Sequence, residues 1–245
     1  MIDVMRSFTV ATWAIQKGAE KIVLVESPED ALRLKAETPE SLAFTDWPMQ
    51  EEFGLFNSPV ELLELDVAGR TIFQRTSTGT RAAIAAAHCQ PLICAGFVCA
   101  SATAKFISEL SDRDVMYVIS GLDGSAQEDL ACAHFIDALT DDPTTDPTPF
   151  VAEAYRSKAA EELRLAVNQG KAGVHPRDIE MCLEVDTLDF CLIASTEKVG
   201  LTLRKVTPKS AKGRQRPLDI LSAQRPLLGV KRKFNSMKIP FLTGR

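Results

Sequence analysis

The chain has 245 residues, of which 45% are hydrophobic and 25% charged, and its formal net charge is −5. These ordinary values argue against a disordered, collagen-like or coiled-coil protein. No apolar run approaches the roughly 20 residues of a membrane span, and no secretory signal is visible at the N-terminus. A bulk nucleic-acid binder would be basic overall, whereas this chain is mildly acidic.

The charge is unevenly distributed along the chain. Residues 208–245 hold ten Lys and Arg against a single acid, Asp219, so this tail carries +9 and the other 207 residues carry −14. The tail has four prolines and no sustained periodicity, which predicts disorder. It could bind nucleic acid or an acidic surface, but a tail without a role is the favoured interpretation.

The cysteines and histidines do not form a recognisable metal-binding pattern. No C-x-x-C pair occurs, and the three histidines form no zinc-hydrolase cluster, so a zinc site is not expected. Buried, reduced thiols in a cytoplasmic protein are the simplest interpretation. The cysteines are Cys89, Cys94, Cys99, Cys132, Cys182 and Cys191.

Short apolar strands alternate with helical stretches in the first part of the chain. Strands are predicted over residues 21–25, 71–74, 92–94 and 115–119. Helices are predicted over residues 10–18, 28–37, 81–88, 100–110 and 128–139. This order predicts an α/β fold with a mostly parallel sheet and helices on both faces.

The chain divides into four predicted regions. Residues 1–140 are expected to form the α/β core, which contains all the candidate site residues, and residues 141–149 (DDPTTDPTP) form a linker. Residues 150–207 form a small C-terminal α+β extension, with helices over 150–167 and 177–183 and two strands, over 190–194 and 201–206. The basic tail, residues 208–245, follows.

Polar segments follow the predicted strands, where ligands bind in α/β folds. Residues 76–81 (TSTGTR) lie between a strand and an Ala-rich helix. Gly79 permits a tight turn, the N–H groups and hydroxyls of Ser77, Thr78 and Thr80 could hold an anion, and Arg81 adds charge. The alternative is an ordinary capped turn, and the spacing of a P-loop is missing.

Asp3 and Arg6 lie near the end of an apolar N-terminal segment. Asp3 is either a metal ligand or nucleophile, or the N-cap of the following helix. Arg6 could bind phosphate or sulfonate bidentately, although a solvated surface position is the commoner fate of an arginine. Because position 5 is Met, no D-x-D pair supports the aspartyl-phosphate scheme.

Other candidates are weaker on spacing alone. Asn57 and Ser58 precede Pro59 in a turn or helix start, where Ser58 could be the cap. Glu128 and Asp129 open a helix, where acids are expected for electrostatic reasons but could also bind a metal, and Asp123 is a weaker metal candidate. Cys99 has no neighbouring base, and the C-x5-R loop of cysteine phosphatases is absent, so Cys99 is expected to pack against the site.

Several colinear segments together resemble one family. They are residues 3–9 (DVMRSFT), 54–59 (GLFNSP), 74–81 (QRTSTGTR), 97–104 (FVCASATA), 128–133 (EDLACA) and 178–190 (DIEMCLEVDTLDF). In this order they resemble the 2-phosphosulfolactate phosphatases, known from coenzyme M biosynthesis, and are closest to the bacterial branch. The resemblance spans residue 1 to about residue 206.

The resemblance implies a Mg²⁺-dependent phosphatase that converts 2-phospho-3-sulfolactate to 3-sulfolactate and phosphate. Asp3, Glu128 and Asp129 would hold the metal, with Asp3 and Arg6 catalytic. The substrate and its phosphate would be bound by Asn57, Ser58, Ser77, Thr78, Gly79, Thr80 and Arg81. A metal-activated water would attack, although the sequence leaves the nucleophile open. The partner is thus a small phosphoester, and a homo-oligomer is compatible with such a domain.

The chain departs from the family pattern at three places. The motif begins already at Asp3, so the first strand is expected to be cut short or the start misassigned. A glutamate expected within residues 42–49 is absent, with Thr45 or Asp46 nearby, and Phe56 replaces the usual Gly before Asn57. These departures leave open a non-catalytic or repurposed relative that binds a small anion or a partner.

Overall fold

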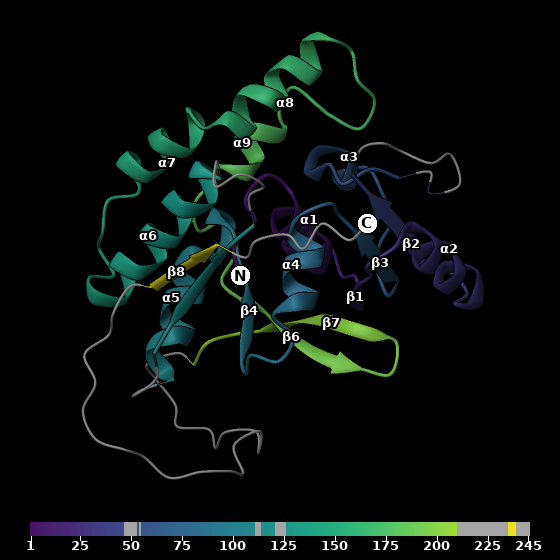
Figure 1. Ribbon diagram of the computed structural model, residues 1–245, viewed down its shortest axis with the longest axis horizontal. Coiled ribbons are helices and arrows are strands. Elements are labelled where there is room, and N and C mark those ends of the chain that lie inside the picture. The colour runs from purple at the N-terminus through teal and green to yellow at the C-terminus, as the bar shows by residue number, and fades with distance from the viewer. Residues whose placement is uncertain (47–52, 54, 111–113, 121–125, 210–234, 239–245) are drawn as a thin grey trace.

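A computed structural model of the protein describes residues 1–46, 53, 55–110, 114–120, 126–209 and 235–238. Its strands are β1 (Lys21–Leu24), β2 (Leu42–Thr45), β3 (Thr71–Arg75), β4 (Leu92–Cys94), β5 (Met116–Ile119), β6 (Cys191–Glu197), β7 (Gly200–Val206) and β8 (Asn235–Lys238). Its helices are α1 (Ser7–Gln16), α2 (Pro28–Glu37), α3 (Pro59–Leu63), α4 (Gly79–Ala85), η1 (Phe97–Cys99), α5 (Ala100–Glu109), α6 (Gln127–Asp141), α7 (Thr148–Tyr155), α8 (Lys158–Asn168) and α9 (Asp178–Cys182). Figure 1 shows this arrangement, which confirms the α/β class.

The strands form two parallel sets joined by an antiparallel hairpin. The six-stranded sheet has the order β2-β3-β1-β7-β6-β4, in which β2, β3 and β1 are parallel and the β6–β7 hairpin pairs antiparallel to β1 and β4. Ile2 bridges β4 and β5 in parallel through Ala95 and Ile119. The N-terminal segment therefore connects the six-stranded sheet to the parallel pair of β5 and β8.

Strand β1 shows why helices cover both faces of the sheet. Alternate residues of a strand point to opposite faces. Ile22 and Leu24 belong to a core cluster that includes Phe8 of α1, whereas Val23 packs with Ala31 of α2 in another cluster. The apolar run of β1 is thus explained by burial on both sides.

Most predicted elements of the core are confirmed with shifts of one to three residues at their ends. Ser58 caps α3, because its Oγ accepts a hydrogen bond from the N–H of Glu61 at 3.2 Å. Strand β2 was not predicted, because its residues, LAFT, lack the run of β-branched side chains that marks β1, KIVL. The structure places β2 at the edge of the sheet, beside β3.

The single helix predicted over residues 150–167 is wrong. The segment forms two helices, α7 and α8, separated by Arg156 and Ser157. Ser157 has extended backbone angles, and its side chain accepts a hydrogen bond from the N–H of Ala160 at 3.2 Å. A buried N-cap thus starts a new helix inside an otherwise helix-favouring stretch.

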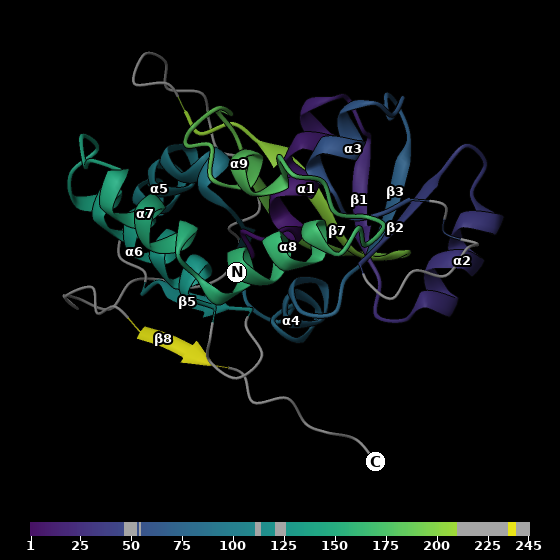
Figure 2. The ribbon, with the colours of Figure 1, turned by 90° about the horizontal axis from the view of Figure 1, so that it is seen from above.

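The prediction that the whole basic tail is disordered is also wrong for one segment. Residues 235–238 form β8, which lies parallel to β5 (Figure 2). The tail residues 210–234 and 239–245 lie outside the described part of the chain. Among the helices that the structure describes, none is long and apolar enough to cross a membrane.

Candidate active site

A cavity of about 320 Å³ lies beside the N-terminal segment and has two unlike sides. One side, called here the polar side, consists of Asp3, Arg6, Ser7, Asp46, Asn57, Thr76, Ser77 and Thr78. The other side, called here the α8 wall, presents Ala159, Leu163 and Ala166 at helical spacing. The cavity is also lined by Met5, Glu162, Lys171 and Val174. Figures 1 and 2 show α8 running across the molecule toward α3.

Asp3 is held at the end of the N-terminal strand segment. Its backbone N–H donates to the carbonyl of Ala95 at 3.3 Å, while its Oδ1 accepts from the N–H of Ser7 at 2.9 Å. Its Oδ2 faces the hydroxyls of Ser120 at 3.2 Å and Thr78 at 3.5 Å. The carboxyl group is buried, and burial raises its pKa to about 6, with these hydrogen bonds opposing the shift.

Asp129 lies behind Asp3 and shares a hydroxyl with it. Its Oδ1 accepts from the N–H of Val4 at 2.7 Å, and its Oδ2 accepts from Ser120 Oγ at 2.7 Å. Because a serine hydroxyl has one proton, Ser120 can donate to only one of the two carboxylates at a time. Burial and then the charge of Asp3 raise the pKa of Asp129 well above its ordinary value. The pair therefore favours a proton or a cation between its members.

Glu128 precedes Asp129 at the start of α6 but does not line the cavity. Burial is the main cause that raises its pKa to about 7, and its Oε2 is buried without a hydrogen-bond partner in the described part of the chain. Across the described residues, no three His, Cys, Asp or Glu side chains gather in an arrangement that could hold a metal ion. Asp123, a weaker metal candidate, lies outside them.

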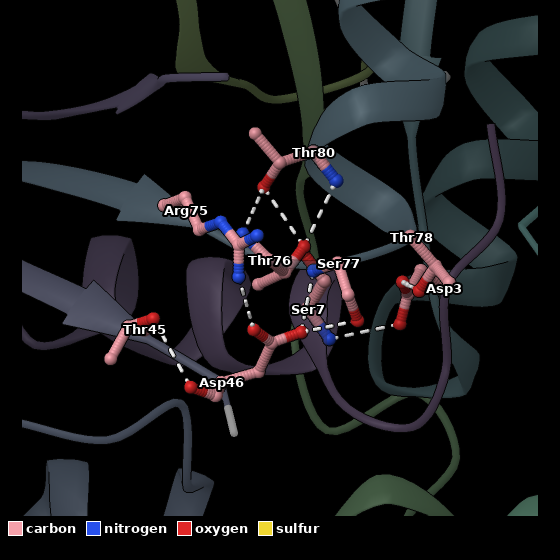
Figure 3. A network of polar contacts seen from close by, with 9 residues as sticks. All are labelled: Asp3, Ser7, Thr45, Asp46, Arg75, Thr76, Ser77, Thr78 and Thr80. Carbon is pink, nitrogen blue, oxygen red and sulfur yellow. Dashed lines mark hydrogen bonds and ion pairs between the residues drawn. The ribbon is translucent and has the colours of Figure 1, made fainter. Parts of the chain in front are cut away.

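The turn after β3 is braced by its own hydroxyls (Figure 3). Thr76 and Thr80 exchange hydrogen bonds: the Thr80 hydroxyl accepts from the Thr76 N–H at 3.1 Å, and the Thr76 hydroxyl accepts from the Thr80 N–H at 3.0 Å. Gly79 lies directly against Asp3, so that an added Cβ would collide with the Asp3 carboxylate and approach Ser7 Cβ to 2.9 Å. The glycine thus allows the carboxylate and the turn to meet.

Asp46, at the end of β2, already occupies donors of this turn (Figure 3). Its Oδ2 accepts from the Ser77 hydroxyl at 2.6 Å and from the Ser77 N–H, and its Oδ1 pairs with Arg75 Nη1 at 3.0 Å. The charge of Asp46 contributes to the raised pKa of Asp3. Sequence reasoning weighed Asp46 only as a substitute for a missing glutamate, and the structure places it on the cavity.

Arg6 lines the cavity and is paired with an acid that sequence reasoning did not single out. Its Nη1 donates to Asp178 Oδ2 at 2.7 Å and to the carbonyl of Gly173 at 2.6 Å. Asn57 also lines the cavity, with its Oδ1 held by Gln74 Nε2 at 2.8 Å. This hydrogen bond leaves the amide donors of Asn57 available to a ligand.

The structure gathers five of the predicted site residues on the cavity: Asp3, Arg6, Asn57, Ser77 and Thr78. The other six do not line it: Ser58, Gly79, Thr80, Arg81, Glu128 and Asp129. Gly79 and Thr80 contact Asp3 and Thr76, which line it. Ser58 bonds Asp178, Asp129 shares the Ser120 hydroxyl with Asp3, and Arg81 is exposed on α4. Ser7, Ser120 and α8 were missed. The apolar spacing of Ala159, Leu163 and Ala166 indicated an amphipathic helix but not what the helix covers.

Cys99 is fully buried, and burial raises the pKa of its thiol. It accepts a hydrogen bond from Thr103 at 3.8 Å rather than pairing with a base. A thiol that resists ionisation is a poor nucleophile, in line with a packing role.

Comparison with known proteins finds relatives that cover most of the chain. The sequence model described as 2-phosphosulpholactate phosphatase matches residues 1–197. The chain belongs to this family. Its members are phosphatases, which are phosphoric monoester hydrolases, and the matched span includes all the cavity-lining residues.

Several relatives with the name "Probable 2-phosphosulfolactate phosphatase" cover most of the chain. The Bacillus subtilis relative is 27% identical over 214 residues, which are 84% of this chain and 90% of that protein. The Carboxydothermus hydrogenoformans relative is 30% identical over 199 residues, 77% of this chain and 82% of that protein. The Thermoplasma acidophilum relative is 25% identical over 217 residues, 82% and 91% respectively.

Proposed function

We propose that the protein is a phosphatase for a small anionic phosphoester, 2-phosphosulfolactate, which water cleaves to sulfolactate and phosphate. One observation carries the proposal beyond family membership: a buried carboxylate, Asp3, faces the hydroxyl turn at Thr78 inside a cavity that Arg6 also lines. Phosphoryl transfer depends on positioning and on positive charge around the phosphoryl oxygens. The cavity brings both kinds of group together.

The residues of the polar side have separate expected tasks. Arg6 binds phosphoryl oxygens through its guanidinium, and the amide of Asn57 donates to the same group. Burial raises the pKa of Asp3 to about 6, which makes this carboxylate a ready partner for a proton or for a cation. Asp46 holds Ser77 in place and must release it if the substrate is to use those donors.

We further propose Mg²⁺ as the cofactor, held by Asp3 and Asp129. The two buried acids lie on either side of one hydroxyl, that of Ser120, and the charge of Asp3 raises the pKa of Asp129. Mg²⁺ prefers oxygen ligands and commonly takes one or two carboxylates, with substrate oxygens and water completing its shell. The pair therefore fits this ion, which when bound would supply positive charge for the phosphoryl group. Glu128 bonds Ser157 rather than Ser120, the hydroxyl that joins Asp3 and Asp129, and is left as a neighbouring charge.

We place this activity in the cytoplasm and, by the family resemblance, in the chemistry that supplies coenzyme M or related sulfonates. All six cysteines are free thiols, which is usual in a reducing compartment.

The test is phosphate release from a panel of small phosphoesters that includes 2-phosphosulfolactate, with and without Mg²⁺. We expect Mg²⁺-dependent turnover, and a loss of about 1,000-fold or more in Asp3→Asn. The matched control, Asp30→Asn, changes an exposed acid on α2 and should retain full activity. Folded protein that binds phosphate but hydrolyses no phosphoester would instead support the repurposed relative.

A further inference from the structure

Asp178 begins α9 and is fully buried, yet it does not line the cavity. Its Oδ1 accepts from Ser58 Oγ at 2.6 Å and from the N–H of Val60 at 3.4 Å. Its Oδ2 accepts from Arg6 Nη1 at 2.7 Å and from the N–H of His175 at 3.0 Å. A buried carboxylate is costly unless its oxygens are paired, and here each oxygen has two donors. Three segments that are distant in the sequence therefore meet at one charge.

The hydrogen bonds of Arg6 use only one of its three nitrogens. A guanidinium has five N–H donors in a rigid planar fork. Nη1 donates to Asp178 and to the carbonyl of Gly173, while Nε and Nη2 donate to nothing within the part of the chain that the structure describes. Because Arg6 lines the cavity, its Nε/Nη2 edge is the part left for an anion. That edge offers two parallel donors, which match two oxygens of a phosphate.

The second acceptor of Arg6 is also fixed by packing. Gly173 has a φ of 76°, which favours glycine, and a Cβ at this position would overlap the ring of Phe56. The close approach of Phe56 thus depends on the glycine and confines the carbonyl that Arg6 meets.

We propose that Asp178 is a positioning residue that fixes the guanidinium of Arg6 so that its Nε/Nη2 edge binds a phosphate group in the cavity. That the ligand is a phosphate rests on the proposed function. That Asp178 positions Arg6 rests only on the contacts of these two side chains. Asp178 thereby also ties the segment that follows α8 to the polar side of the cavity. A purely structural role would instead stabilise the start of α9 without any effect on anion binding.

The experiment is a double-mutant cycle on the affinity for inorganic phosphate, measured by calorimetry with the full-length chain. Arg6→Gln removes the fork, and Asp178→Asn removes only the negative charge. Asparagine can turn its oxygen toward Arg6 and His175 and its amide toward Ser58 Oγ, so this variant should fold. We expect phosphate to bind about 100-fold more weakly in Arg6→Gln and about tenfold more weakly in Asp178→Asn. The double variant should match Arg6→Gln alone, because Asp178 acts only through Arg6.

Turnover gives a second readout that a structural role would not move. In Asp178→Asn we expect KM to rise about tenfold while kcat stays within about threefold, since substrate binding is weakened in ground and transition states alike. Leu203→Val, a fully buried change on β7 away from the cavity lining, is the control for lost stability and should leave both constants unchanged. If Asp178→Asn does not fold, Asp178→Glu keeps the charge and displaces it by one methylene. Asp178→Glu should also weaken phosphate binding and raise KM, and it should have no further effect when Arg6 is already replaced by Gln.

Additive effects of the two substitutions, an unchanged affinity in Asp178→Asn, or no phosphate binding by the native protein would each overturn the proposal. The proposed function fails separately. A native protein that binds phosphate non-additively but hydrolyses nothing keeps the positioning role and loses the phosphatase. A native protein that hydrolyses phosphoesters with an additive cycle keeps the phosphatase and loses the positioning role.

Discussion

The two sides of the cavity are built by different means. The polar side comes from chain ends and turns that follow strands, with Asp3, Asp46 and Ser77 brought together by hydrogen bonds between segments far apart in the sequence. The α8 wall comes from one continuous helix, whose Ala159 and Leu163 reach the cavity through helical spacing alone. The polar side holds charges that burial makes costly, whereas the α8 wall offers apolar surface with little electrostatic demand.

This difference indicates which side of the cavity tolerates substitutions without loss of turnover. On the polar side, a shift of a few tenths of an ångström changes charge–charge and hydrogen-bond distances together. On the α8 wall, a smaller side chain removes contact area and leaves the reacting groups in place. We therefore expect substitutions at Asp3 and the turn beside it to act on turnover, those that disturb Arg6 to act on anion binding, and those on the α8 wall to act on apolar contact with the substrate.

Apart from the loss of Asp3 itself, the largest effect on turnover should come from Gly79→Ala, at the tightest point of the polar side. The new Cβ would collide with the Asp3 carboxylate and approach Ser7 Cβ to 2.9 Å, so Asp3 must move. A displacement near 1 Å of a group that positions substrate costs about 100-fold in kcat/KM. Steady-state kinetics with a phosphoester substrate measures this loss.

Gly69→Ala is the control for strain at a glycine. Its φ is 70°, and no other group lies within 4 Å of the added Cβ, so the change should cost roughly 1 kcal/mol of stability and no activity. Unchanged kinetics in Gly79→Ala would mean that the contact between Asp3 and the turn is irrelevant to turnover.

The sequence predicted the polar side better than the α8 wall, for a physical reason. The residues after β3 could be recognised from the local sequence, because a cluster of hydroxyls with a glycine between a strand and a helix is typical of an anion-binding or capped turn. Asp3 stood out as a carboxylate in an apolar context. The partners of these groups are long-range: Ser120 lies 117 positions from Asp3, and Asp178 lies 172 from Arg6. Such pairs depend on topology, which local patterns do not contain.

The fold shows the same limit. The strands and helices of the core were predicted from periodicity and caps, but their pairing was not. The hairpin of β6 and β7 lies between β1 and β4, and Ile2 joins β4 to β5. Whether a short edge strand such as β2 forms, and whether a serine such as Ser157 starts a new helix, depends on neighbours in space. Strand β2 was therefore missed, and one helix was predicted where α7 and α8 are separate.

Two buried acids, Asp3 on the polar side and Glu128 near it, should also make stability depend on pH. This effect is expected to be smaller than that of Gly79→Ala on turnover. Burial raises the pKa of Asp3 from 3.8 to about 6 and that of Glu128 from 4.5 to about 7. The folded protein therefore binds more protons than the unfolded chain between about pH 4 and pH 7, and the free energy of unfolding falls as the pH rises through this window. Without metal, Tm at pH 8 should lie on the order of 5 °C below Tm at pH 5.

Calorimetry with and without Mg²⁺ sharpens this expectation. A cation favours the ionised carboxylates, so Mg²⁺ should raise Tm more at pH 8 than at pH 5. Asp3→Asn should reduce both the fall in Tm and the effect of Mg²⁺, whereas the exposed Asp30→Asn should change neither. A Tm that rises steadily from pH 5 to pH 8 in all three proteins would contradict the assignment of these pKa shifts.

The smallest effect should come from the α8 wall itself. Leu163→Ala removes part of the apolar surface that faces the cavity, at a position that is only partly buried. The lost contact should raise KM about fivefold and leave kcat within about twofold, because no group on the polar side moves. Leu165→Ala on the same helix is the matched control, since this side chain is 54% exposed and does not line the cavity. Equal kinetics for the two variants would show that α8 does not contact the substrate. A large fall in kcat for Leu163→Ala would show that a change on the α8 wall displaces groups on the polar side. The two sides would then not act separately on substrate binding and turnover.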